Sequence, residues 1–138
     1  MASFRKFEEI ESWKMARVLT QMVYQASARG EFARDFAMRD QVCRASLSIM
    51  ANIAEGFERN GNREFIQFLS VAKGSAGEVR SFLYVAHDLG YITHVDFEEL
   101  RSSCRSIAAA IQGLADYLRS SDCVGSKFAA PQHGPNNP

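Results

Sequence analysis

Polar side chains that could bind a ligand or take part in catalysis follow one face of the segment between residues 35 and 59. Their spacing of three or four residues is that of a single helix face. These residues are Gln41, Arg44, Ser48, Asn52, Glu55 and Arg59. Glu55 precedes Arg59 by four residues, the favourable order for a helical ion pair, but it has no partnered base or nucleophile. We therefore expect a structural polar stripe that fixes helix register through hydrogen bonds. A ligand- or partner-binding seam is the alternative, and no enzymatic activity is expected.

A second group with possible chemistry contains His87, Asp88, His94 and Asp96. Two imidazoles with carboxylates could bind a metal ion. However, Asp96 also fits a helix cap, and a histidine near a helix C-terminus suits the helix dipole. The sequence therefore favours structural roles, and we expect neither a metal site nor a cofactor.

Basic side chains between residues 39 and 80 are candidate contacts to nucleic-acid phosphates. They are Arg39, Arg44, Arg59, Arg63, Lys73 and Arg80. Acidic residues lie nearby in the sequence, so each cation could instead be a solvated charge or a member of an ion pair. We expect a nucleic-acid surface on the second and third long helices.

Small side chains follow one face of the next segment at spacings of four, three and four residues. They are Ser70, Gly74, Gly77 and Ser81. An interior glycine costs a helix roughly 1 kcal/mol relative to alanine. We therefore expect a close-packing stripe, approached by another backbone either inside the bundle or across a subunit contact.

These residues are positioned by four predicted helices, at about residues 9–28, 35–59, 62–88 and 93–120. Asp35, Asn62 and Thr93 are candidate N-caps, and Asn60, Gly61 and Asn62 form a predicted turn. From residue 97 onwards, a regular 3-4 apolar repeat is typical of a bundle helix. The short connections predict an all-α, up-down-up-down antiparallel four-helix bundle over residues 1–121. Residues 122–138 are expected to be a disordered tail.

The composition supports one helical domain and limits the classes of function. All three prolines lie in the last eight of the 138 residues, and 46% of the chain is hydrophobic. The 16 basic and 16 acidic side chains cancel, which is untypical of a non-specific nucleic-acid binder but allows a local basic patch. No apolar run has the roughly 20 residues of a membrane span. Three cysteines without CxxC spacing indicate a reducing cytoplasm, with Cys43 and Cys104 packing as small apolar groups.

Several motifs resemble those of one known family. They occur in order as "ESWKMAR", "RDQVCRA", "NIAEGFER", "REFIQFL", "GSAGE" and "AHDLGYI", within about residues 4–120. The chain is similar to the four-helix-bundle proteins encoded in intervening sequences of bacterial 23S ribosomal RNA genes. Many of these relatives have proline where this chain has Met50.

The resemblance implies a homopentamer of up-down bundles around a central channel. Related accessory factors of diversity-generating retroelements bind a reverse transcriptase and nucleic acid, but they are strongly basic, unlike this neutral chain. No enzymatic activity is established for the family. We therefore expect a non-catalytic oligomer that binds RNA, a ribonucleoprotein or a nucleic-acid-processing protein. The alternative is a protein scaffold or adaptor that binds no nucleic acid.

Overall fold

The computed structural model describes residues 4–121 and contains only helices and connecting segments over that range. A short 3-10 helix, η1 (Phe7–Glu9), precedes the first α-helix. The α-helices are α1 (Glu11–Ser27), α2 (Gly30–Arg34), α3 (Phe36–Glu58), α4 (Asn62–Asp88) and α5 (His94–Ser120). The all-α prediction is confirmed, whereas the predicted tail at 122–138 lies outside the described residues.

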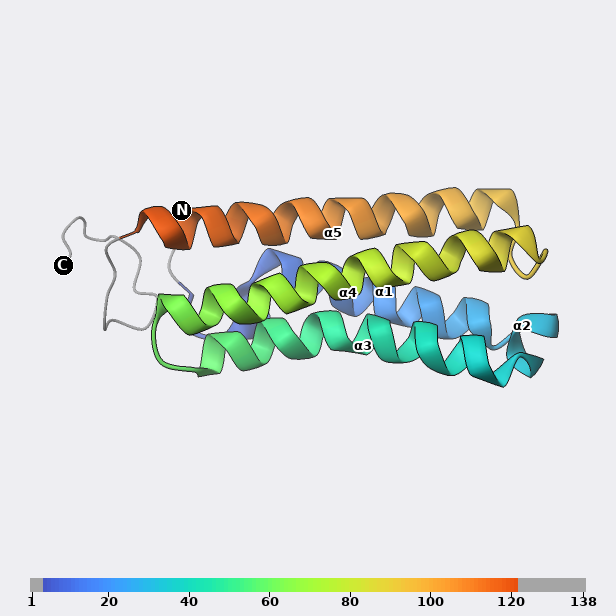
Figure 1. Cartoon of the computed structure of the whole chain (residues 1–138), viewed down its shortest axis with the longest axis horizontal. Coiled ribbons are helices and arrows are strands. Elements are labelled where there is room, and N and C mark those ends of the chain that lie inside the picture. Colours follow the sequence, from blue (N-terminus) through green and yellow to red (C-terminus); the bar gives the residue numbers. More distant parts are fainter. Residues whose placement is uncertain (1–3, 122–138) are drawn as a thin grey trace.

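The four long helices lie side by side and alternate in direction along the bundle (Figure 1). α1 contacts α3, α3 contacts α4, α4 contacts α5, and α5 contacts α1. Each long helix therefore has two neighbours, and the α1–α3 side of the bundle is opposite the α4–α5 side. The short connections place sequence neighbours antiparallel, as their lengths predicted.

The apolar stripes of these helices meet in one core. On α5 the predicted 3-4 repeat is buried throughout, which confirms it as the core face. Its members are Phe97, Leu100, Cys104, Ile107, Ile111, Leu114 and Leu118. The same stripe leaves the other side of α5 available to solvent or to a partner.

Two of the three predicted helix caps are present. The Oδ1 atom of Asp35 accepts a hydrogen bond from the Met38 amide at 3.1 Å, and Thr93 Oγ1 accepts one from the Asp96 amide at 3.1 Å. The Asn62 cap was wrong, because Gly61 takes the cap position with φ of 93° and Asn62 is already helical. The Asn62 amide instead donates to the Leu118 carbonyl at 3.3 Å and ties the start of α4 to the end of α5.

A short helix, α2, was not predicted from the sequence. The expected break after α1 is present, but Gly30, with φ of 56°, begins a further helical turn. This turn buries Phe32, whose ring lies 5.3 Å from that of Tyr91. The Tyr91 hydroxyl donates to Asp35 Oδ2 at 2.8 Å, so α2 and two connections close this end of the bundle.

Candidate nucleic-acid interface

The centre of the polar stripe joins α3 to α4. Ser48 and Asn52 are half-buried, whereas the other four stripe residues are exposed. The Asn52 side-chain amide donates to the Ser48 carbonyl at 2.8 Å and to Ser48 Oγ at 2.9 Å. Ser75 Oγ on α4 donates to Ser48 Oγ at 2.9 Å. This part of the stripe therefore forms the kind of inter-helix network that its spacing suggested.

The C-terminal end of the stripe is an exposed ion pair. Arg59 donates to Glu55 at 2.8 Å, and its guanidinium lies 5.1 Å from the centre of the Phe68 ring. The hydrogen bond that Arg59 donates to Glu55 raises the pKa of Arg59 further above its ordinary value. Because its charge is already matched, Arg59 is a weaker candidate for a phosphate contact than an unpaired arginine.

The small-residue stripe faces outward from α4. Ser70, Gly74, Gly77 and Ser81 are all exposed. A Cβ atom added to either glycine would have no other described atom within 4 Å, apart from its own helical surroundings. Close approach inside the bundle is therefore wrong for these glycines, and a subunit contact stays a prediction.

The glycine that permits close helix packing is Gly56 on α3. A Cβ at this position would lie 2.6 Å from Phe68 Cβ and 2.9 Å from Phe65 Cδ1, both on α4. Such distances are too short for ordinary non-bonded contact, so only the missing side chain lets α3 and α4 come this close.

The six predicted phosphate contacts do not form one patch within the described chain. Arg39 and Arg44 line a pocket between α1 and α3, and Arg59 is paired on α3. Arg63 is exposed at the start of α4. Lys73 and Arg80 lie seven residues apart on α4, and Lys73 contacts Gln112 of α5.

Two hydrogen bonds fix the register between α4 and α5. Lys73 Nζ donates to Gln112 Oε1 at 2.7 Å, and Arg101 donates to the Tyr84 hydroxyl at 3.2 Å. The partners are eleven residues apart on each helix, a separation that returns to the same helix face after three turns.

Because the helices are antiparallel, the same register places Arg80 opposite Arg105. Arg80 follows Lys73 by seven residues, and Arg105 precedes Gln112 by seven, so both lie on the facing sides. Lys73, Arg80, Arg101 and Arg105 thus form a row along the contact between α4 and α5, which we call the α4–α5 cationic seam.

The charges of the seam are only partly compensated. Arg101 donates to Glu98 at 2.6 Å, and its hydrogen bonds to Tyr84 and Glu98 raise the pKa of this arginine. Arg80 and Arg105 are exposed and form no ion pair with any described residue. Asp116, beside the end of the seam, pairs with Arg119 at 3.1 Å. The seam therefore presents free guanidinium groups in a chain of zero net charge.

The histidines near the α4–α5 turn come together without completing a metal site. His94 Nδ1 lies 3.4 Å from His87 Nε2, and the His87 ring stacks on Phe97 at 4.5 Å. Among residues 4–121, no three histidine, cysteine or acidic side chains group closely enough to hold a metal ion. Thr93 is the cap of α5, and Asp96 takes part only by donating its backbone amide to Thr93 Oγ1.

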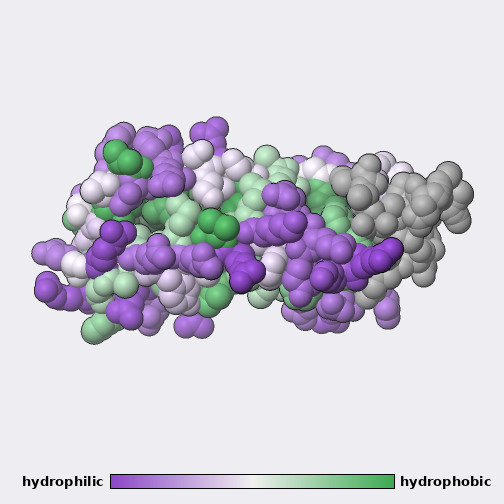
Figure 2. Space-filling model, turned by 180° about the vertical axis from the view of Figure 1, so that it is seen from behind, coloured by the Kyte–Doolittle hydropathy of each residue, from purple (hydrophilic) through white to green (hydrophobic). Residues whose placement is uncertain are grey.

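The surface alternates between hydrophilic and apolar areas. Seen from the side opposite to Figure 1, apolar groups are interrupted by hydrophilic side chains (Figure 2). The large apolar side chains that are most exposed over the described range are Val18, Tyr24, Phe36, Leu47, Val71, Tyr84, Val85, Leu89 and Val95. No helix within that range is long and apolar enough to cross a membrane.

Sequence reasoning missed Arg101 and Arg105 as members of the basic surface. The candidate contacts were sought on the second and third long helices alone, while half of the seam lies on the fourth. The sequence does contain a matching pattern, because Lys73 and Tyr84 are eleven residues apart and so are Arg101 and Gln112. This pattern predicts the α4–α5 register only once the two helices are known to be antiparallel neighbours.

The fold and these surfaces define a helical bundle with a polar network between α3 and α4 and a row of basic side chains along α4 and α5. The family model for the 23S rRNA-intervening sequence protein matches residues 8–113, and the chain belongs to that family. It is similar in fold to a crystal structure of a protein with unknown function from the S23 ribosomal protein family of Bacteroides thetaiotaomicron VPI-5482. That similarity has a TM-score of 0.70 at 21% identity and covers 75% of this chain and 97% of the other. The comparison with curated proteins gave no match.

Proposed function

We propose that the protein is a non-catalytic, oligomeric RNA- or ribonucleoprotein-binding bundle whose α4–α5 cationic seam contacts phosphates. The observation that supports this most directly is the α4–α5 register, which sets the unpaired Arg80 and Arg105 opposite each other. Guanidinium groups bind phosphate oxygens by charge-assisted hydrogen bonds, and such contacts supply most of the affinity for nucleic acid.

The proposal includes a homopentamer, in line with the family resemblance. Five copies would repeat the seam, so that modest single contacts gain from avidity. The outward glycines Gly74 and Gly77 and the exposed Val71 and Val85 on α4 are the candidate subunit contact. The proposed compartment is the cytoplasm, where the free Cys43 and Cys104 would remain reduced.

The test is a titration of the full chain against single-stranded and structured RNA at several salt concentrations. The logarithm of the binding constant should fall linearly with that of the salt concentration. In the double variant Arg80→Gln/Arg105→Gln, the slope for single-stranded RNA should shrink by about 1.4 for each subunit that contacts the RNA, because each such subunit loses two phosphate contacts. Arg34→Gln is the matched control, since Arg34 is exposed on α2 and has no ion pair with the described residues.

An unchanged slope in the double variant would refute the seam as the RNA contact. If the wild-type protein binds no RNA even at low salt, the RNA proposal fails altogether. The second candidate, a protein scaffold or adaptor, would then be favoured by the exposed apolar side chains of α4. Its partner would be sought by affinity capture with the same two variants.

A further inference from the structure

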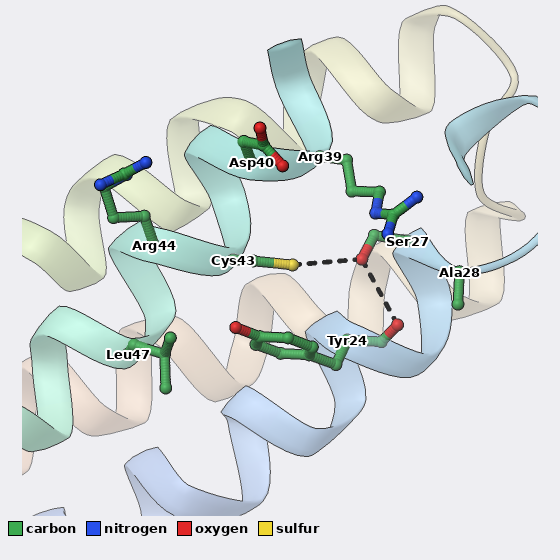
Figure 3. A pocket seen from close by; sticks show the side chains of 8 residues that line it. All are labelled: Tyr24, Ser27, Ala28, Arg39, Asp40, Cys43, Arg44 and Leu47. Carbon is green, nitrogen blue, oxygen red and sulfur yellow. Dashed lines mark hydrogen bonds between the residues drawn. The ribbon is translucent and has the colours of Figure 1, made fainter. Parts of the chain in front are cut away.

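A pocket of about 430 Å³ lies between α1 and α3, on the side of the bundle opposite the cationic seam. This volume falls within the range of small-molecule sites. Figure 3 shows its floor, where Cys43 and Ser27 approach each other at 3.3 Å. The floor is uncharged, so a charged group of a ligand would have to be bound by side chains at the rim of the pocket.

The rim carries two arginines from α3. Arg39 is half-buried, and one of its guanidinium nitrogens donates to the Ala33 carbonyl at 2.9 Å. That contact holds the side chain in place but uses only one of five N–H donors. Arg39 therefore resembles a preorganised anion ligand more than a freely moving surface cation.

Arg44 is exposed and unpaired with respect to the described residues. Asp40 precedes it by four residues, which is the favourable order for a helical ion pair. The two side chains nevertheless point apart in Figure 3 and form no salt bridge. Arg44 is thus available to a ligand, while Asp40 keeps a carboxylate free to accept hydrogen bonds.

The remaining walls are apolar and come from both helices. Tyr24 of α1 is 45% exposed and Leu47 of α3 is 44% exposed, and they approach the groove from opposite sides (Figure 3). An aromatic ring beside an aliphatic side chain suits a flat heterocycle. The guanidinium groups suit an anion, and the carboxylate suits an N–H or hydroxyl donor.

We propose that this pocket binds a nucleoside monophosphate unit, with its base against Tyr24 and Leu47 and its phosphate on the exposed Arg44, while Arg39 lies at the other end of the pocket (Figure 3). A nucleotide combines the flat heterocycle, the anion and the hydrogen-bond donors that these walls match. Its source is either a free mononucleotide or an unpaired position in RNA. The pocket is separate from the seam, so this site does not depend on the proposed RNA contact.

The test is calorimetric titration of the full chain with AMP, GMP, CMP and UMP, beside adenosine and inorganic phosphate. At least one monophosphate should bind saturably and more tightly than either adenosine or phosphate. Arg44→Gln should weaken it about tenfold, as expected for loss of a charge-assisted contact. Tyr24→Leu should also weaken it. Arg63→Gln, which removes an exposed unpaired arginine from α4, should leave the affinity unchanged.

Three results would overturn the proposal. One is the absence of saturable binding of all four monophosphates at millimolar concentration. Another is binding of inorganic phosphate as tight as that of any nucleotide, which would indicate a simple anion site. The third is an equal loss of affinity in Arg44→Gln and Arg63→Gln. Circular dichroism of each variant establishes that the fold is retained.

A final binding measurement distinguishes free nucleotide from RNA as the ligand of the pocket, and it also distinguishes the pocket from the cationic seam. If Arg44→Gln also weakens a short single-stranded oligoribonucleotide, the pocket accepts an RNA position. If it weakens only mononucleotides, the ligand is free nucleotide, and either result agrees with the proposal. The Arg80→Gln/Arg105→Gln variant should bind mononucleotide with unchanged affinity, so failure of the seam leaves the pocket intact.

Discussion

Replacing Gly56 by alanine should destabilise the bundle, although alanine is the better helix former. The added Cβ would meet Phe68 Cβ at 2.6 Å and Phe65 Cδ1 at 2.9 Å. The Phe68 atom is next to the backbone, so a rotamer change cannot remove the first clash. To restore ordinary contact, α4 would have to move away from α3 by about 0.8 Å. Protein cores are close-packed, so such a shift would disturb the neighbouring side chains.

Overpacking of this kind costs about 1–3 kcal/mol, whereas the gain in helix propensity is about 1 kcal/mol. Because the clash is with an atom next to the backbone, the overpacking cost of Gly56→Ala should lie at the upper end of that range. We therefore expect a net loss of roughly 1–2 kcal/mol in the free energy of unfolding. Urea unfolding followed by circular dichroism measures it, at several protein concentrations because association adds to apparent stability.

The matched controls are Gly74→Ala and Gly77→Ala on α4. Nothing among the described residues lies within 4 Å of the added Cβ, so each should stabilise the separate subunit by about 1 kcal/mol. If these glycines form the proposed subunit contact, light scattering should show weaker association at the same time. A Gly56→Ala protein as stable as the wild type would refute the close-packing argument.

Three further outcomes follow from the hydrogen bonds and the buried thiol. Asn52→Ala should lower the free energy of unfolding by about 1 kcal/mol in urea titration, and Glu55→Ala should lower it less, because the Glu55 carboxylate is exposed. Equal losses would contradict this difference. Asp35→Ala should cost about 1 kcal/mol or more by the same measurement, since it removes the cap of α3 and the acceptor for Tyr91. Burial raises the pKa of the Cys104 thiol from 9.0 to about 12, so its stabilising effect is full below pH 9 and is lost as the pH rises towards 12. Wild type should lose about 1.4 kcal/mol per pH unit relative to Cys104→Val above pH 9, and parallel stability curves would refute this expectation.

The helices could be predicted because their signals are local. The unbroken apolar repeat of α5 and the caps at Asp35 and Thr93 depend on residues within a few positions of one another. Asn62 shows the limit of that reasoning, because Gly61 and Asn62 both suit the start of a helix. In the structure the Asn62 side chain donates to the Leu118 carbonyl of α5, a contact that no local pattern reveals.

The glycines show why the close contact was assigned to the wrong helix face. Regular spacing of Gly74 and Gly77 on α4 is visible in the sequence, but it says nothing about which side faces a neighbour. Gly56 is a lone glycine within an apolar stretch of α3, with no spacing to mark it. Its role depends on two phenylalanines of α4, which become neighbours only when the helices pack.

The same dependence on packing explains how a chain of zero net charge can present a row of basic side chains. Lys73 and Arg80 on α4 become a row only because α5 places Arg101 and Arg105 beside them. Glu98 compensates only Arg101 within this row, and Asp116 is paired with Arg119 outside it. Binding of a polyanion depends on the local arrangement of unpaired cations, since screening limits charge interactions to about 10 Å. Net charge is therefore a poor guide to the partner of a bundle that carries such a row of unpaired cations.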